Sequence, residues 1–309
     1  MNIRVVFIVL CSILFCTSCS AISKEDKEWI IKKSLTDLVY VKGGTFMLGD
    51  VGYTDSLGVH QYFAHHSSAL PVHQVTLDSY SIGKLEVTYK EFDLFCKATG
   101  RELVGDKYSR TKGPFIRPEL TAVRLTWDHA MAYCEWLSKL TGLPFNLATN
   151  AQWEYAARNR GKAVGYATDN GLLDRGRNFK SRKYKSFIFN PPPGSYPPNP
   201  LGLYDMTGGW AEWVRDGYMP YSVITKVNPL DDYQHNIITI RGFNWDVYNR
   251  GYRGHECDGA GVCIRFVVNK KEAIDVKKVL KRLGITAPSE EEIAHFMPKT
   301  WVEKGKYPL

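Results

Sequence analysis

The sequence predicts an α+β fold in which irregular, loop-rich segments take up much of the chain. Three observations support this fold class. Helix caps precede apolar stripes at helical spacing in the first half of the chain, and a short apolar run ahead of two glycines indicates a strand. Beyond Arg160 the chain is rich in Gly, Pro, Asn and aromatic residues, with few long periodic segments. Such a chain must satisfy its backbone groups through side chains, ions and water as well as through ladders.

The first expected strand is Leu38–Val41, and Gly43 and Gly44 after it indicate a turn. Three helices follow, each predicted from a polar cap before the apolar stripe and a stop signal behind it. The expected helices run from Thr88 to Gly100, from Thr126 to Gly142, and from Thr149 to Arg158. Cys96 and Cys134 fall on the apolar faces of the first two, where they are expected to fill core volume.

The second half of the chain begins with segments that cannot form helices. The run 190–199 contains five prolines and is expected to be extended or turned. Helical spacing returns near the end, where Val276, Val279, Leu280 and Leu283 form an amphipathic stripe before Gly284. Ser289 with Glu292 predicts a short second helix. The apolar stripe is expected to pack on the domain, with the lysines of the opposite face in water or on lipid headgroups.

Three separated segments carry a family resemblance: Asn146-Leu-Ala-Thr-Asn-Ala-Gln-Trp-Glu-Tyr-Ala-Ala-Arg158, Gly202-Leu-Tyr-Asp-Met-Thr-Gly-Gly-Trp-Ala-Glu-Trp213 and Arg241-Gly-Phe-Asn-Trp245. In this order and at these separations they resemble the formylglycine-generating enzyme family, also called sulfatase-modifying factors. The resemblance implies the irregular α+β fold of that family, which is related to C-type lectins. It also implies a single domain over residues 37–269, with residues 270–309 as a helical C-terminal extension.

The N-terminus resembles a bacterial lipoprotein signal. Residues 1–18 comprise Arg4, an apolar run from Val5 to Phe15, and the small pair before Cys19. The prediction is cleavage before Cys19 and lipidation of that cysteine, with residues 19–36 as a tether; ordinary cleavage after Ala21 is the alternative. By resemblance to enteric lipoproteins, Ser20 implies sorting to the periplasmic face of the outer membrane of the bacterial cell envelope.

The resemblance also assigns the chemistry of the active family members, in which two cysteines hold copper(I) and activate oxygen. Counting from Trp245, those positions are Val247 and Tyr252, which cannot supply thiolates. Copper binding is therefore not expected. Cys257 and Cys263 are the only candidates for a displaced catalytic site, and a disulfide between them is the alternative. Some relatives instead pair a cysteine at the position of Cys134 with one close to Cys263.

The resemblance also implies a structural calcium ion as a candidate cofactor. In relatives, residues matching Asn178, Phe179 and Glu212 help to hold calcium through side-chain and carbonyl oxygens. Gly209 has lost the amide that would supply another oxygen, which water can replace at a cost in affinity. The alternative is that Glu212 only accepts hydrogen bonds from backbone N–H groups.

Charge and motifs together favour a binding or scaffold module over an active oxidoreductase. The chain carries a net charge of +8, but both signs are interspersed, so no nucleic-acid partner is expected. The leading hypothesis is a lipid-anchored envelope protein that has lost the copper cysteines and acts as a binding or scaffold module for a protein partner. The alternative is an active formylglycine-generating or related non-haem metal oxidoreductase, in sulfatase or siderophore maturation, with a displaced metal site.

Overall fold

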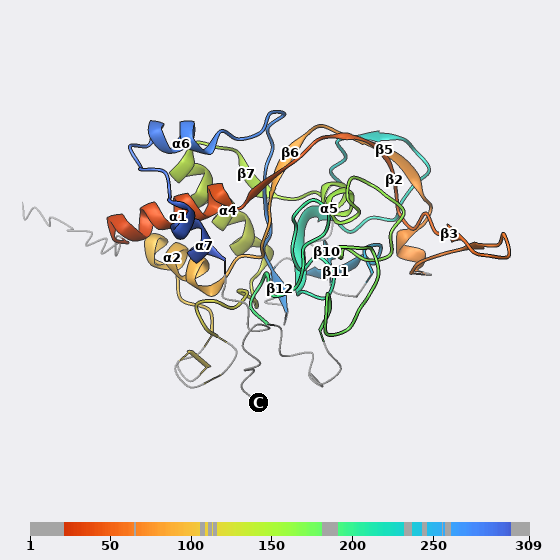
Figure 1. Cartoon of the computed structure of the whole chain (residues 1–309), viewed down its shortest axis with the longest axis horizontal. Coiled ribbons are helices and arrows are strands. Elements are labelled where there is room, and N and C mark those ends of the chain that lie inside the picture. Colours follow the sequence, from red (N-terminus) through yellow and green to blue (C-terminus); the bar gives the residue numbers. More distant parts are fainter. Residues whose placement is uncertain are drawn as a thin grey trace, which may run out of the picture.

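The computed structural model describes residues 22–64, 66–105, 109–110, 113, 116–180, 191–231, 237–242, 246–254, 256 and 261–297. They form one α+β domain, as expected. Five helices gather at one end of the long axis: α1 (Lys24–Thr36), α2 (Tyr89–Thr99), α4 (Trp127–Thr141), α6 (Val276–Arg282) and α7 (Glu290–Phe296) (Figure 1). The hairpin of β3 (Tyr53–Thr54) and β4 (His60–Gln61) lies at the other end. One apolar cluster lies among the helices, and a second lies between α5 (Asn150–Ala157) and the sheets around it. In the described part of the chain, no helix is long and apolar enough to cross a membrane.

The central antiparallel sheet joins the two ends of the domain. Its strand order is β1-β6-β13-β7, with β1 at Leu38–Val41, β6 at Tyr80–Gly83, β13 at Phe266–Val268 and β7 at Phe145–Leu147. Ile82 of β6 is the register partner of both Val39 and Val267. The predicted strand Leu38–Val41 is therefore confirmed, and it lies two strands away from the last strand of the domain.

A second sheet holds the motif residues. Its order is β11-β10-β8-β12, with β11 at Gly251–Gly254, β10 at Ile237–Arg241, β8 at Ala211–Gly217 and β12 at Val262–Cys263. Glu212 of β8 is in register with Arg241 on one side and with Cys263 on the other. This register brings two motif segments into one buried centre.

The remaining strands form the end of the domain away from the helices. A three-stranded sheet has the order β2-β5-β9, with β2 at Gly44–Leu48, β5 at His73–Leu77 and β9 at Lys226–Val227. Beyond it lie the β3 (Tyr53–Thr54) and β4 (His60–Gln61) hairpin and the short 3-10 helix η1 at Ser67–Ala69.

All three helices predicted from caps are confirmed. They are α2 at Tyr89–Thr99, α4 at Trp127–Thr141 and α5 at Asn150–Ala157. Thr88, Thr126 and Thr149 each accept a hydrogen bond from the backbone of the third helical residue, as a capping box requires. Gly100 and Gly142 end the first two helices in left-handed conformations.

The N-terminal segment differs from the expected tether. Lys24–Thr36 is a regular helix, α1, which buries Ile30, Ile31 and Leu35 in the helical core. Two polar residues allow this burial, because Lys33 donates a hydrogen bond to Asp37 and both are almost fully buried. Helix α1, with its N-cap Ser23, is therefore part of the folded domain.

The C-terminal extension folds onto α1. The predicted amphipathic helix is α6 at Val276–Arg282, which buries Leu280, and the short second helix is α7 at Glu290–Phe296. Phe296 meets Trp29 of α1 edge to face, with ring centroids 6.0 Å apart, and Lys32 pairs with Glu292 at 2.9 Å. The extension is thus a packed part of the helical end.

Candidate functional site

Glu212 sits at the centre of a buried ion-pair network. Its carboxylate accepts hydrogen bonds from Arg265 Nε and Nη2 at 2.8–3.0 Å and from Trp153 Nε1 at 2.7 Å. Arg265 also donates to the carbonyls of Gly83 and Tyr204 at 3.0 and 2.9 Å. Both charged side chains are about 1% exposed. One ion pair therefore ties β8 to α5, β6 and the segment just before β13.

A second buried network uses the other motif residues. Glu154 of α5 accepts from Arg158 at 2.7 Å and from Arg241 of β10 at 2.8 Å, and it also caps the backbone N–H of Gly49. Arg241 in turn donates to the carbonyl of Val247 at 2.6 Å. The motif segments 146–158, 202–213 and 241–245 thus contribute buried polar residues that hold the loops together, which is the role expected of a chain with few ladders.

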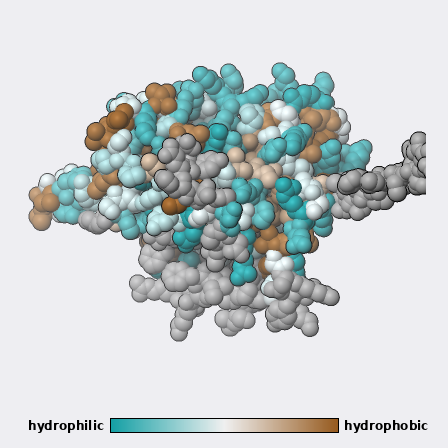
Figure 2. Space-filling view, turned by 180° about the vertical axis from the view of Figure 1, so that it is seen from behind, coloured by the Kyte–Doolittle hydropathy of each residue, from teal (hydrophilic) through white to brown (hydrophobic). Residues whose placement is uncertain are grey.

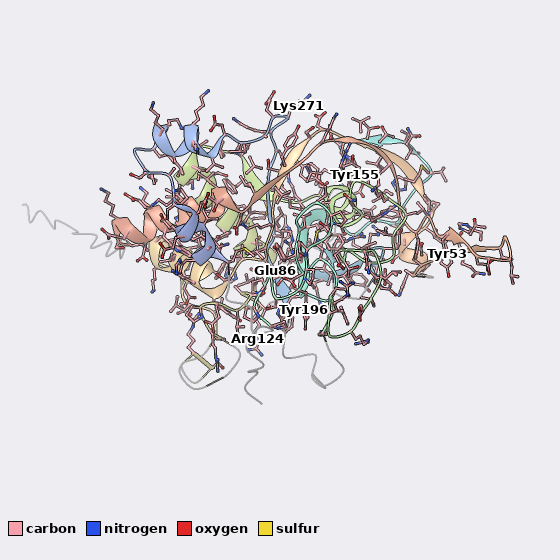
Figure 3. All side chains as sticks on the ribbon, in the orientation of Figure 1. Tyr53, Glu86, Arg124, Tyr155, Tyr196 and Lys271 are labelled. Atoms are coloured by element: carbon pink, nitrogen blue, oxygen red, sulfur yellow. The ribbon has the colours of Figure 1, made fainter. Side chains whose placement is uncertain are left out.

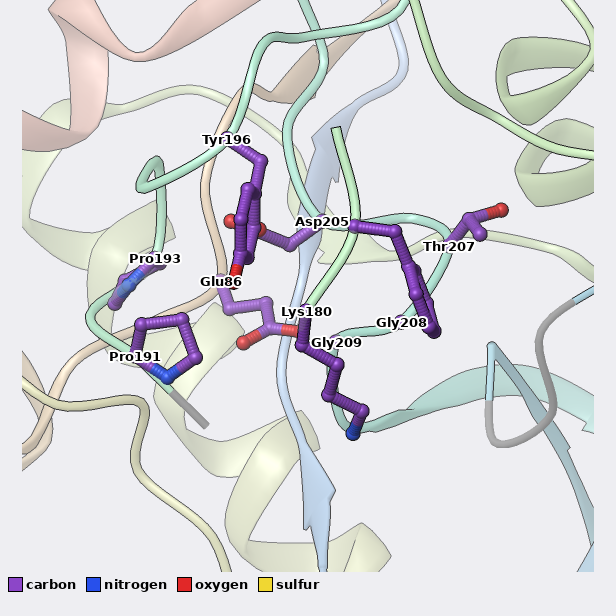
Figure 4. Close-up of a pocket in the computed structure, with 10 residues that line it drawn as sticks. Glu86, Lys180, Pro191, Pro193, Tyr196, Asp205, Thr207, Gly208 and Gly209 are labelled. Atoms are coloured by element: carbon purple, nitrogen blue, oxygen red, sulfur yellow. The ribbon is translucent and has the colours of Figure 1, made fainter. Parts of the chain in front are cut away.

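Beside Glu212 lies a small cavity with two further carboxyl groups, Glu86 and Asp205. It has room for about one water molecule, ≈ 10 Å³. Its lining is drawn in Figure 4 and comprises Glu86, Phe179, Lys180, Pro191, Pro193, Tyr196, Asp205, Thr207, Gly208 and Gly209. Figure 3 places Glu86 and Tyr196 near the middle of the molecule, far from Tyr53 on the hairpin.

The carboxyl groups of the cavity accept hydrogen bonds from backbone N–H groups and from one hydroxyl group. Glu86 Oε1 accepts from the backbone N–H of Trp210 at 3.0 Å, and Glu86 Oε2 accepts from the Thr121 hydroxyl at 2.5 Å. Asp205 Oδ2 accepts from the N–H of Gly194 at 2.6 Å. A Cβ atom at Gly209 would lie 2.4 Å from Glu86 Oε1 and 2.4 Å from the Asp205 carbonyl. Glycine at 209, in place of the family's asparagine, is therefore required by the packing around Glu86.

Burial sets the protonation of this cavity. It raises the pKa of Glu86 to about 8, helped by the negative charges of Asp205 and Glu212 and opposed by Arg265 and Thr121. Burial also raises the pKa of Asp205 to about 6, although the Gly194 N–H and Arg265 act against it. At neutral pH, Glu86 is thus mainly protonated, so the cavity carries less negative charge than its two carboxyl groups, Glu86 and Asp205, suggest.

The residues expected to bind calcium are each engaged by protein groups. Asn178 Oδ1 accepts from the N–H of Asp174 at 2.8 Å, and its Nδ2 donates to Asp169 and to the carbonyl of Leu172. The carbonyl oxygen of Phe179 accepts a hydrogen bond from the N–H of Gly176 at 2.7 Å. Calcium at Glu212 would have to displace Arg265, so the donor set does not fit the ion at that residue. Among the residues that the structure describes, no three His, Cys, Asp or Glu side chains converge to hold a metal ion.

The two copper-cysteine positions lie in different environments. Val247 is completely buried in the second apolar cluster, and its N–H donates to the Gly165 carbonyl at 3.0 Å. Tyr252 lies on β11, is 54% exposed and packs against Tyr218 with ring centroids 4.9 Å apart. One position is thus a core residue and the other is a surface residue.

The displaced-site candidates are only partly described. Cys263 is a free, buried thiol, and burial, with Glu86 and Glu212 adding to it, raises its pKa well above the usual range. Cys134 is also free and buried, so both thiols resemble core side chains. Cys257 lies outside the described residues, as does Cys19. The pairing of Cys257 with Cys263 and the lipidation of Cys19 stay predictions.

Sequence reasoning selected Glu212 but missed its surroundings. Asp205 lies inside the motif segment 202–213 and Glu86 lies outside the three motif segments, and neither is among the predicted site residues. Glu86 reaches the cavity from just beyond β6, 124 residues before Trp210, whose N–H it accepts. The available signal was a carboxylate inside an otherwise apolar stretch, Leu85-Glu-Val87.

Comparison with known proteins places this geometry in a family. Residues 25–262 match the model of the sulfatase-modifying factor enzyme 1-like domain. A Chlamydia pneumoniae protein named serine/threonine-protein kinase pkn1 is 35% identical over 202 residues, 64% of this chain and 30% of that protein. The formylglycine-generating enzyme of Bos taurus is 23% identical over 245 residues, 63% of this chain and 62% of the enzyme. The chain therefore spans less than two thirds of the length of either relative.

A solved structure agrees with the sequence comparisons. The structure of PvdO from Pseudomonas aeruginosa superposes with a TM-score of 0.60 at 25% identity, covering 75% of this chain and 93% of that one. The family model matches well over half of the chain, including α1 and the strands that carry Glu212 and Arg241. The chain therefore belongs to the FGE-sulfatase family of sulfatase-modifying factor enzyme 1-like domains.

Proposed function

We propose that this protein is a lipid-anchored binding or scaffold module of the bacterial cell envelope that does not oxidise cysteine. The proposal rests on the residues that occupy the two positions where active family members have copper-binding cysteines. Val247 is a fully buried core residue and Tyr252 is an exposed surface residue, so neither residue type nor placement supplies a thiolate pair for copper(I).

The acidic cavity does not supply another active site of useful size. Its room is that of about one water molecule, ≈ 10 Å³, so it admits neither a peptide nor a small organic substrate. Its carboxyl groups are already hydrogen-bonded to Trp210, Thr121 and Gly194. They act by tying three loops together.

Exposed apolar residues provide surface for a protein partner. Val223, Ile224 and Val227 lie on and just before the edge strand β9, and each is more than 60% exposed. Apolar residues of this kind stand out as brown areas on an otherwise mixed surface in Figure 2. Exposed apolar residues that cluster in this way are typical of protein interaction sites.

The alternative is an active oxidoreductase with a displaced metal site at Cys257 and Cys263. Cys263 counts against it, because copper(I) needs a thiolate and the burial of Cys263 favours the neutral thiol. Activity would then depend on a thiol whose deprotonation the fold opposes.

Incubation of the full chain with a Cys-x-Pro-x-Arg peptide, copper(I) and oxygen tests the two functions. We expect the peptide mass to stay unchanged, while a formylglycine-generating enzyme that carries both cysteines converts the same peptide. Conversion of the peptide thiol to an aldehyde by this chain, abolished by Cys263→Ser, would establish the displaced oxidase instead.

A further inference from the structure

The start of α1 limits how far the domain can lie from a lipid anchor. Ile22 packs against the helical core, and Ser23 is the N-cap of α1 and accepts a hydrogen bond from the N–H of Asp26, so both residues are fixed to the folded domain. Cys19 precedes Ser23 by four residues, which span at most ~14 Å even when fully extended. The polar headgroup zone on each side of a bilayer is itself roughly 5–8 Å thick.

Helix α1 cannot lengthen this connection by unwinding. Ile30, Ile31 and Leu35 are buried in the helical core, and Trp29 and Lys32 contact α7. Unwinding beyond the first turn would expose these apolar side chains and break the pair with Glu292. A lipid on Cys19 therefore holds the helical end of the domain (left in Figure 1) close to the headgroups.

Charge distinguishes the faces of this end. Exposed Lys277, Lys278, Lys281 and Arg282 all lie on α6, which contains no acidic residue between Val276 and Arg282. On the other side, α7 begins with Glu290, Glu291 and Glu292. Both helices contact α1, whose own exposed first turn carries Lys24, Glu25 and Lys27.

We propose that the α6 face of the helical end lies against the bilayer, with Lys277, Lys278 and Lys281 contacting anionic phospholipid headgroups and α7 turned away. Basic residues near a membrane surface are attracted to anionic lipid, and acidic residues are not. The four-residue connection supplies the proximity, and the lysines supply the orientation. This inference rests on the proposed anchoring at Cys19.

Amine acetylation followed by mass spectrometry tests the orientation. The lipidated full chain is compared in vesicles containing phosphatidylglycerol and in detergent micelles. We expect acetylation of Lys277, Lys278 and Lys281 to slow by about fivefold or more in vesicles, the effect of ~1 kcal/mol per basic residue. Exposed Lys42 and Lys162, which lie near β2 and α5, are the controls and should react equally in both. Equal rates for the α6 lysines would overturn the proposal.

A variant separates charge from simple crowding. In Lys277→Glu/Lys281→Glu, Lys278 remains as the reporter, and the proposal requires it to lose most of its protection. Continued protection of Lys278 in that variant would refute headgroup contact through these lysines. The substituted side chains are exposed, so the fold is expected to persist.

Lipidation of Cys19 and membrane contact of the α6 lysines can be tested separately. The mass of the N-terminal peptide reports whether Cys19 carries lipid, which is the test of the proposed anchoring. If it does not, the chain beginning at Cys19 is coupled through that thiol to a maleimide phospholipid and the acetylation is repeated. Protection of the α6 lysines then supports the surface without the native lipid, and its absence refutes the surface itself.

Discussion

Glu212 and Glu86 are two buried carboxyl groups of one centre, and they differ in charge because only Glu212 is paired with an arginine. Glu212 is paired with Arg265 and accepts a further bond from Trp153, so its negative charge is compensated inside the fold. Glu86 has no cation within hydrogen-bonding distance among the bonds described, and burial raises its pKa to about 8. The first residue acts as an anion and the second mainly as a neutral acid.

Glu212→Ala should strongly destabilise the domain, because it leaves the guanidinium of Arg265 buried without its partner. Breaking one side of a buried ion pair costs about 3–5 kcal/mol, which urea denaturation measures as a lower midpoint. Glu135→Ala is the matched control, because the Glu135–Lys139 pair is exposed to solvent and contributes little to stability. If calcium were the partner of Glu212, removing calcium from the wild-type protein with a chelator would lower the urea midpoint in the same way. We expect the chelator to leave the midpoint unchanged.

At the residue scale, the sequence identified Glu212 but neither its ion-pair partner nor the two other carboxyl groups beside it. Glu212 could be selected because its motif was recognisable. Its partner Arg265 lies 53 residues away, and Asp205 and Glu86 reach the same cavity through two further segments. Nothing in local spacing predicts which of several carboxylates will be neutral, because that depends on burial and on neighbours that only the folded chain brings together.

At the scale of elements, local signals predicted helices well where the cap and the stripe agree. Thr88 and Thr149 form the expected capping boxes, and Thr126, which was expected to open its helix, forms one with His129. Helix α1 was missed because its apolar residues are few and its sequence is highly charged. The burial of Lys33 depends on Asp37, an ion pair that a pattern of apolar residues cannot reveal.

Asp216 links three elements and should make stability depend on pH. It lies near the end of β8 and accepts from the N–H of Asn150, at the start of α5, at 2.7 Å and from the N–H of Asp231 at 3.3 Å. Burial raises its pKa to about 7, with Asp231 adding to the effect and the two N–H groups opposing it. The folded protein thus binds a proton here that the unfolded chain has already lost.

The sign follows from the raised pKa. The contribution of Asp216 to stability is complete below about pH 4, the ordinary pKa of an aspartic acid, and is lost as the pH rises through about 7. Asp216→Asn cannot titrate, so the free energy of unfolding of the variant should gain on that of the wild type between pH 4 and 7 and run parallel to it above pH 8. Urea denaturation at several pH values measures this difference; a difference that stays constant across the range would show that Asp216 is not the titrating group.

At the scale of the whole molecule, the first helix and the last two helices that the structure describes lie in the same part of the fold. The central sheet places β1 and β13 on either side of β6, and α1 packs against both α6 and α7. The resemblance predicted the domain between these ends, but not that the segment before it and the extension behind it would pack together. That packing follows from Trp29, Lys32, Leu280 and Phe296, four residues that lie in unrelated parts of the sequence.

The buried side chains of the C-terminal extension should therefore contribute to the stability of the domain as core residues do. Leu280 is fully buried and Phe296 is 3% exposed against Trp29, so Leu280→Ala should cost about 2–5 kcal/mol and Phe296→Ala about 3–5 kcal/mol in urea denaturation. Lys281→Ala, on the exposed face of the same helix, is the matched control and should stay within about 0.5 kcal/mol of the wild type. Because α6 and α7 cover α1, loss of either buried side chain should also weaken the attachment of α1, seen as faster amide exchange from residue 30 to residue 35. Wild-type stability of both alanine variants would show that the extension only rests on the domain, and that α1 is held by α2 and α4 alone.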